Sequence, residues 1–375
     1  MKFKTILLLF FITVNSLAIF SYENDSFPKA VKGVFDLKEV DLAKSDKISL
    51  NGEWEFYPYK IYSPKDFLNN SLTDEITKNK TFITVPSPWN NKIINQKKMG
   101  GNGFATYRLK IVNLKPQKVS LKMNCINTSY KLWINDKEVF EVGKVGNDKK
   151  SSSPKVIHKE IYFDSSDDQI EITINVANYF HKNGGVMESI YIGKIQNIIN
   201  FKLYNMGIEL FLLGGIIIMG FYQLTLFVFR RKDMSPLFYS LFCFFISIRL
   251  LFTGEKLIYN IIPFINWEMG LKLEYLSFYL GLPTFFIFLY LMFKKEIKII
   301  YVKILCATSA LFILTVIFTN SEIYSNTLFT YSIITILTSL YMLYVLMKAV
   351  YLKRSGAKQF LLGFTILLAG YLNDF

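Results

Sequence analysis

The sequence predicts an exported all-β sandwich or jelly roll followed by an all-α bundle that crosses a membrane several times. Three observations predict this fold class. Short alternating strand-like runs fill the first half of the 375-residue chain, almost continuous apolar sequence fills the second half, and a short basic and then apolar segment stands at the N-terminus. Hydrophobic residues make up 51% of the chain, which excludes a disordered protein.

Residues 1–21 have the pattern of a secretory signal peptide. Lys2 and Lys4 precede an apolar run from Thr5 to Val14, and small residues follow. The apolar run is too short to span a bilayer comfortably. The alternative is an uncleaved N-terminal anchor, and both interpretations place the following residues outside the cytoplasm.

Residues 22–199 are predicted to form one all-β domain. Alternation is clearest at 169–178, where Ile170, Ile172 and Ile174 point one way and polar residues point the other way. Turn signals such as Asn51-Gly52 separate the runs. Strands divided in this way are typical of a sandwich or jelly roll. The expected strands are 48–58, 80–86, 104–114, 118–126, 130–142, 155–163, 169–178 and 189–196.

Residues 200–375 contain apolar segments of about the 20 residues that a spanning helix requires. Because backbone groups in hydrocarbon must hydrogen-bond within their own segment, each segment is expected to be a helix. Basic clusters at 230–232, 294–298 and 353–358 alternate with outer loops that carry far fewer basic residues, so the positive-inside rule agrees with an exported N-terminal domain. The expected helices are 206–229, 236–253, 273–293, 297–319, 327–350 and 359–375.

The net charge of +14 is explained by these clusters between apolar segments, so we do not expect nucleic acid as a partner. The chain has three cysteines and two histidines, and it contains no phosphate-binding, zinc-binding or nucleophile motif. We therefore expect no catalytic residue, no cofactor and no metal site in this chain.

The last apolar segment ends at Phe375 without a polar tail. An even number of spans would leave this end outside the cell. We therefore expect the chain to be a fragment or truncated product that lacks a seventh helix and an output module.

The membrane half resembles the bacterial seven-transmembrane receptors with diverse intracellular signalling modules (7TMR-DISM). The likeness is carried by residues 222–257, by LKLEYLSFYLGLP (271–283) and by AKQFLLGFTILLAGYLNDF (357–375). It implies a multi-pass receptor of the bacterial cytoplasmic membrane with its N-terminal domain outside. It also implies a cytoplasmic effector after helix seven, such as a diguanylate cyclase or a histidine kinase, and it makes a homodimer a reasonable expectation.

The exported half is similar to galactose-binding-like jelly rolls. The matching pieces are LNGEWEF (50–56), VPSPWNN (85–91), KLWINDKEVFEVG (131–143) and NYFHKNGGVMESIYIG (178–193). The resemblance implies a jelly roll over residues 48–196 and a carbohydrate-like ligand, and it supports the fold better than the ligand.

Two loops of the predicted sandwich carry the candidate ligand residues, since loops at one end of a rigid sandwich commonly bind ligands. In the first loop, the tryptophan either stacks on a sugar ring or packs in the core. In the second, the histidine, asparagine and glycine backbone either hydrogen-bond hydroxyls or a carboxylate, or serve only the turn. The candidates are Trp89, Asn90, Asn178, His181, Gly184 and Gly185.

Arg249 lies in an apolar run at the outer end of the second helix, where a charge needs a partner. Glu274 and Glu255 are the candidate partners, and such a pair would hold helices two and three in one signalling state. The alternative is an arginine that snorkels to the interface. Asp374, at the end of the last segment, raises the same question.

These features together predict the sensor and membrane part of a signal-transduction receptor. An extracytoplasmic ligand, a sugar by resemblance, would shift the first helix through a short connector at 194–206 and pass the signal to a cytoplasmic effector. The alternative is a membrane-anchored carbohydrate-binding module with no signalling role. A membrane enzyme or transporter is disfavoured because the helices carry no interior set of catalytic residues and no clear repeat.

Overall fold

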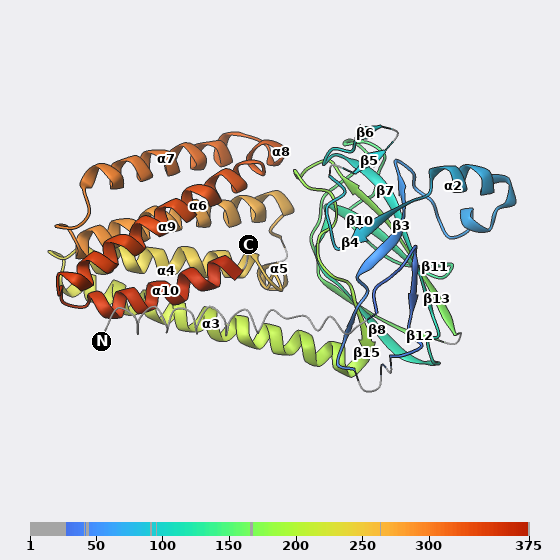
Figure 1. The fold of residues 1–375 in the computed structure, drawn as a ribbon, viewed down its shortest axis with the longest axis horizontal. Coiled ribbons are helices and arrows are strands. Elements are labelled where there is room, and N and C mark those ends of the chain that lie inside the picture. Colours follow the sequence, from blue (N-terminus) through green and yellow to red (C-terminus); the bar gives the residue numbers. More distant parts are fainter. Residues whose placement is uncertain are drawn as a thin grey trace.

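The computed structural model describes residues 28–40, 42, 45–90, 92–94, 96–165, 168–262 and 264–373. A β-sandwich stands at one end of an elongated molecule, a helical bundle stands at the other, and one long helix joins them (Figure 1). The predicted signal peptide and Asp374 lie outside the described residues.

Two sheets form the sandwich. The larger sheet has the strand order β11–β10–β13–β7–β3–β4, with β1 parallel to β7, and the smaller sheet has the order β12–β8–β15–β2. The predicted all-β fold of this half is confirmed. The strands are β1 Val34–Asp36, β2 Ile48–Ser49, β3 Gly52–Pro58, β4 Thr81–Val85, β5 Ile93–Ile94, β6 Lys97–Lys98, β7 Gly103–Val112, β8 Gln117–Met123, β9 Ile126–Asn127, β10 Ser129–Ile134, β11 Lys137–Val142, β12 Lys159–Ser165, β13 Gln169–Asn178, β14 Gly185–Val186 and β15 Tyr191–Lys194.

Three of the expected strands each divide into two, and one of them, 118–126, separates into β8 and the start of β9. The run 48–58 changes sheet at Gly52, which has a φ of +126° and lies so close to the backbone of Ala30 that a Cβ would overlap it. The run 130–142 is the β10–β11 hairpin, which turns at Asn135 with a φ of +55°. The divisions at Gly52 and Asn135 fall at turn residues that the sequence already marked.

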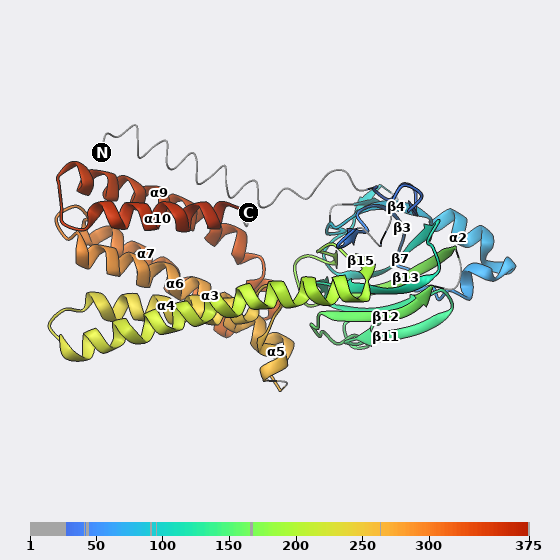
Figure 2. The same cartoon turned by 90° about the horizontal axis from the view of Figure 1, so that it is seen from below.

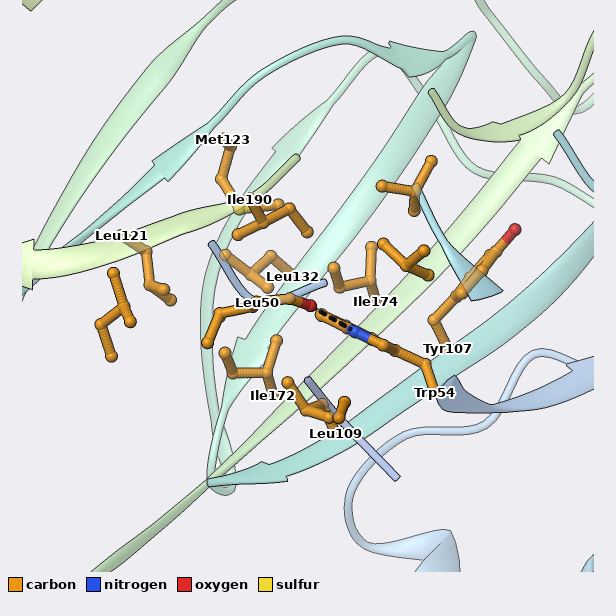
Figure 3. Packing of buried hydrophobic residues seen from close by; sticks show 14 of the residues in the cluster. Leu50, Trp54, Tyr107, Leu109, Leu121, Met123, Leu132, Ile172, Ile174 and Ile190 are labelled. Carbon is orange, nitrogen blue, oxygen red and sulfur yellow. Dashed lines mark hydrogen bonds between the residues drawn. The ribbon is translucent and has the colours of Figure 1, made fainter. Parts of the chain in front are cut away.

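The core lies between the two sheets. Ile170, Ile172 and Ile174 of β13 point into it, as their alternation predicts, and all are buried. Trp54 is fully buried in the same core, where its indole nitrogen donates to the carbonyl oxygen of Leu50 at 2.8 Å (Figure 3). Each such aliphatic side chain stabilises the fold by about 1.5–3 kcal/mol.

The opposite face of β13 is also covered, which the alternation did not predict. Asn175 is only 1% exposed, and its side-chain oxygen accepts a hydrogen bond from the hydroxyl of Thr106 at 2.7 Å. The covering segment contains the short 3-10 helices η1 Asp66–Leu68 and η2 Asn70–Leu72 and the helix α2 Thr73–Asn79. A buried polar residue on a strand therefore marks a hydrogen-bonded layer here and not a solvated face.

The membrane half is helical, as predicted. Within the described residues, five helices are long and apolar enough to cross a membrane, and α10 is a shorter apolar helix. Helix α6 packs against α4, α7 and α9. The helices are α3 Ile195–Phe229, α4 Ser235–Phe252, α5 Ile258–Ile261, α6 Trp267–Met292, α7 Ile299–Phe318, α8 Ser321–Tyr324, α9 Thr327–Tyr351 and α10 Ala357–Asn373.

The expected connector at 194–206 is not a separate linker. Strand β15 ends at Lys194 and α3 begins at Ile195, which is also earlier than the expected domain boundary at 199. At a rise of 1.5 Å per residue, the 35 residues of α3 span about 52 Å. One continuous helix therefore runs from the smaller sheet into the bundle (Figure 2).

Candidate ligand site at the sandwich–membrane junction

The loops at one end of the sandwich rest on the helix ends that face it, and we call this surface the junction (Figure 1). One part of it joins the loops around Lys149 and Lys182 to α8 and to the start of α6. The other joins β8, β12 and α3 to the loop that follows α4. The predicted ligand residues lie beside the first part.

Most of the predicted ligand residues belong to one hydrogen-bonded loop network. The side-chain amide of Asn90 donates to the carbonyl oxygen of Lys182 at 2.8 Å, and its side-chain oxygen accepts from the backbone amide of Gly184 at 3.1 Å. The side-chain amide of Asn178 donates to the carbonyl oxygen of His181 at 2.6 Å. The two loops chosen from the sequence are therefore tied together in space.

Trp89 has no exposed ring face, so the expectation that it stacks on a sugar is wrong in this structure. Its exposed fraction is 0%, and its indole nitrogen donates to the carbonyl oxygen of Gly101 at 3.1 Å. The ring lies against Gly184 so closely that a Cβ there would overlap it. Gly185 is likewise buried, with a φ of +113°. Trp89 and the two glycines shape the loops, which is the alternative that the sequence left open.

His181 is held as a neutral imidazole. Its Nδ1 lies 3.1 Å from the side-chain nitrogen of Asn127 and 3.2 Å from the backbone nitrogen of Asn183. Burial lowers the pKa of His181 to about 4. The same Nδ1 also lies 3.1 Å from the carbonyl oxygen of Asn183, so a neutral ring has a partner at Nδ1 in either tautomer.

A cavity of about 300 Å³ opens beside this network. Its walls come from the two parts of the molecule: five residues belong to sandwich loops and two belong to the loop around α8. None of the lining side chains is apolar. The lining residues are Gly100, Gly101, Asn102, His181, Lys182, Glu322 and Asn326.

Sequence reasoning found only His181 among these lining residues. The run Gly100–Gly103, with three glycines in four positions, is a signal that could have pointed to one wall but was not used. Gly101 lies so close to the carbonyl group of Lys182 that a Cβ would overlap it, so the glycine allows the two loops to touch. The wall from α8 had no local signal.

Direct contacts hold the cavity walls together. The ammonium of Lys149 pairs with Glu322 at 2.6 Å, and the backbone amide of Lys182 donates to the hydroxyl of Ser325 at 3.0 Å. The rings of Phe180 and Trp267 meet edge to face with centroids 6.3 Å apart. A ligand in the cavity would therefore touch the sandwich and the membrane half at once.

A buried ionic cluster forms the second part of the junction. Lys122, which is 1% exposed, pairs with Glu255 of the loop after α4. Asn205 of α3 donates to the same carboxylate at 3.2 Å, and the backbone amide of Glu255 donates to Glu209 of α3 at 2.9 Å. Although burial raises the pKa of Glu255, the His158 imidazole 3.8 Å away and the hydrogen bond from Lys122 lower it to about 2.

The predicted pairing of Arg249 with Glu255 is wrong, because Lys122 engages that carboxylate. The Arg249 guanidinium lies over the ring of Phe278, 4.8 Å from its centroid. Among the described residues no ion pair joins Arg249 to Glu274. The sequence could not identify Lys122 as the partner of Glu255, because Lys122 lies on a strand 133 positions away from it.

Comparison with protein families gives one match. Residues 205–375 match the family described as 7TM diverse intracellular signalling. Comparison with curated proteins gives no match.

Similar solved structures include parts of three glycosidases. The Ruminococcus gnavus β-glucuronidase is 13% identical, with a TM-score of 0.27 over 39% of this chain and 28% of that chain. A GH2 β-galacturonidase from Eisenbergiella tayi is 11% identical, with a TM-score of 0.28 over 40% and 24%. A β-glucuronidase from an uncultured Clostridium is 15% identical, with a TM-score of 0.28 over 39% and 28%. This chain spans only about a quarter of their length, and the likeness bears on neither activity nor ligand.

Proposed function

Residues 205–375 belong to the 7TM diverse intracellular signalling family, and from this premise we propose that the chain is the ligand-sensing and membrane part of a bacterial signal receptor. The family implies a membrane receptor. Our proposal adds that the sandwich binds a small extracytoplasmic ligand in the junction cavity and that this binding alters how the sandwich rests on the helices.

One observation carries the proposal: sandwich loops and the α8 loop line the same cavity. When the two walls separate, the affinity of the cavity for a ligand that contacts both walls changes. Such a difference is the physical requirement for a signal, because a ligand with equal affinity for two arrangements shifts neither. A shift from 1:99 to 99:1 requires about 5.5 kcal/mol of differential binding.

Helix α3 provides a direct route from the sandwich to the membrane. Its first turns pack on the smaller sheet: Ile198 is fully buried, and Lys202 pairs with Glu160 of β12 at 2.7 Å. The side-chain amide of Asn197 donates to the carbonyl oxygen of Ser45 at 3.0 Å. Because no loop separates β15 from α3, a rotation of the sandwich moves the outer end of this helix.

The orientation that we propose puts the sandwich outside the cytoplasmic membrane, exported by residues 1–21. The turns α3–α4, α6–α7 and α9–α10 carry the basic clusters, and they lie at the end of the bundle remote from the sandwich (Figure 1). This agreement supports the positive-inside assignment. A cytoplasmic effector and a second copy of the chain would complete the receptor, and we assign no catalytic step to the residues in this chain.

The competing function is a membrane-anchored sugar-binding module without signalling. Hydrogen–deuterium exchange on the full chain in lipid nanodiscs separates the two, with D-glucose, D-galactose and D-glucuronate as probes. A receptor predicts protection both in loops 98–103 and 180–184 and in residues 321–326 of the α8 region. Protection confined to the sandwich would favour the passive module.

A cavity-filling variant provides the control for that experiment. Asn326→Trp places a large ring in the cavity wall without touching the sandwich core. It should abolish the ligand-induced protection at both places. If protection persists in this variant, the ligand binds elsewhere and the proposed site is wrong.

A further inference from the structure

Lys182 places an uncompensated positive charge in the wall of the junction cavity. Its backbone amide donates a hydrogen bond to the hydroxyl of Ser325, and its carbonyl oxygen accepts one from the side-chain amide of Asn90. No ion pair or hydrogen bond reaches its ammonium from the residues that the structure describes. Burial lowers the pKa of Lys182, which agrees with an ammonium that is partly desolvated and unpaired.

The other charged groups of the cavity already balance one another. Glu322 is the acidic lining residue, and its carboxylate pairs with Lys149 at 2.6 Å. His181 is neutral because burial lowers its pKa to about 4. The cavity therefore has one net positive charge near neutral pH, and a ligand with one negative charge would complement it.

The remaining lining groups favour a ligand rich in hydroxyl groups. They are the amides of Asn102 and Asn326, the imidazole of His181 and the backbone of Gly100 and Gly101. A volume of about 300 Å³ lies at the small end of the range for ligand pockets. An apolar ligand would leave these polar groups without partners, which is unfavourable.

We propose that the junction cavity binds a sugar or polyol that carries one carboxylate, with the Lys182 ammonium as the group that recognises it. This inference rests on the proposed function and narrows its ligand class. A phosphate is a poorer match, since it carries about 1.5 to 2 negative charges at neutral pH against one free positive charge. The carboxylate accepts charge-assisted hydrogen bonds from Lys182, and the hydroxyl groups face the amides.

Isothermal titration of the full chain in nanodiscs tests this inference. The probes are D-glucuronate and D-galacturonate, their neutral counterparts D-glucose and D-galactose, and inorganic phosphate. We expect each uronate to bind more tightly than its neutral counterpart and than phosphate. Lys182→Gln should weaken uronate binding by about 10- to 100-fold and leave neutral sugars nearly unaffected. Lys182→Arg should retain most of the preference.

Lys137→Gln is the matched control, because Lys137 is an exposed lysine outside the cavity lining. It should leave both uronate affinity and neutral-sugar affinity unchanged. The inference is overturned if no uronate binds better than its neutral counterpart, if phosphate binds best, or if Lys182→Gln keeps the preference.

Failure of this inference is distinguishable from failure of the proposed function. If neutral sugars bind and Asn326→Trp abolishes their binding, the cavity is still the ligand site and only the carboxylate assignment fails. If uronates bind with the expected preference but leave residues 321–326 unprotected, the ligand class stands and the signalling role fails.

Discussion

Replacing Lys122 with methionine should weaken the contact between the sandwich and the membrane half at the junction. The lysine and Glu255 side chains are 1% and 7% exposed, so the pair is screened little by water. Methionine keeps most of the apolar stem but leaves a buried carboxylate without its main partner. Loss of one member of a buried pair costs about 3–5 kcal/mol, and we expect Lys122→Met to lower the free energy of junction opening by that amount.

Hydrogen exchange at the amides of β8 and the outer turns of α3 measures this opening free energy locally. A local measurement is needed because a chain with two structural parts does not unfold in a single two-state step. The double variant Lys122→Met with Glu255→Gln should cost less than the sum of the two single variants. A coupling of about 1–3 kcal/mol is expected for groups in direct contact.

A surface pair provides the control for this prediction. Lys131 pairs with Glu138 at 3.0 Å, but the two side chains are 27% and 51% exposed. Lys131→Met should therefore cost only about 0–1 kcal/mol. If Lys122→Met costs no more than this control, or if the two junction variants are additive, the reasoning on the buried cluster is refuted.

Three further results are expected. The contribution of Glu255 to stability should be fully present above its unfolded pKa of 4.5 and should be lost as pH falls toward its folded pKa of about 2. Hydrogen exchange at the same amides over an acid pH series measures this loss. A contribution that is unchanged over that range would contradict the expectation. Gly184→Ala should destabilise the sandwich by about 1–3 kcal/mol in thermal unfolding, because the added methyl group overlaps the Trp89 ring; a neutral effect would contradict the packing. Tyr204→Pro places a proline inside α3 between the sandwich and the bundle. It should leave ligand affinity intact but reduce the ligand-induced changes in hydrogen exchange on the inner half of α3. If these exchange changes are the same as in the unmodified chain, α3 is not the route of the signal.

The sequence was sufficient for the architecture because periodicity is a local property. The alternation of Ile170, Ile172 and Ile174 identified a strand with one face in the core, and apolar length identified the helices. Alternation does not report what covers the second face, so the burial of Asn175 was not foreseen. The start of α3 was placed too late because polar residues at 194–206 mark the limit of the hydrocarbon and not the end of a helix.

Only the part of the candidate site that belongs to the sandwich loop network was predicted from the sequence. Asn90, Asn178 and His181 were found because Asn, Gly and His in loops are visible in one sequence. The role of Trp89 was open, because the sequence pattern of an aromatic loop residue does not show whether its ring is exposed or, as here, buried. Glu322 comes from a loop more than a hundred residues away, and only the docking of sandwich on bundle brings it to the cavity.

The central claim of this account is that the sandwich lies outside the cytoplasmic membrane and the basic turns lie in the cytoplasm. Labelling with a membrane-impermeant maleimide in intact cells tests it, with single cysteines at Lys137 of β11 and at Arg231 of the α3–α4 turn in a variant without Cys125, Cys243 and Cys306. The account predicts that Lys137→Cys is labelled in intact cells and that Arg231→Cys is labelled only after the membrane is made permeable. Labelling of Arg231→Cys in intact cells, or protection of Lys137→Cys, would contradict it.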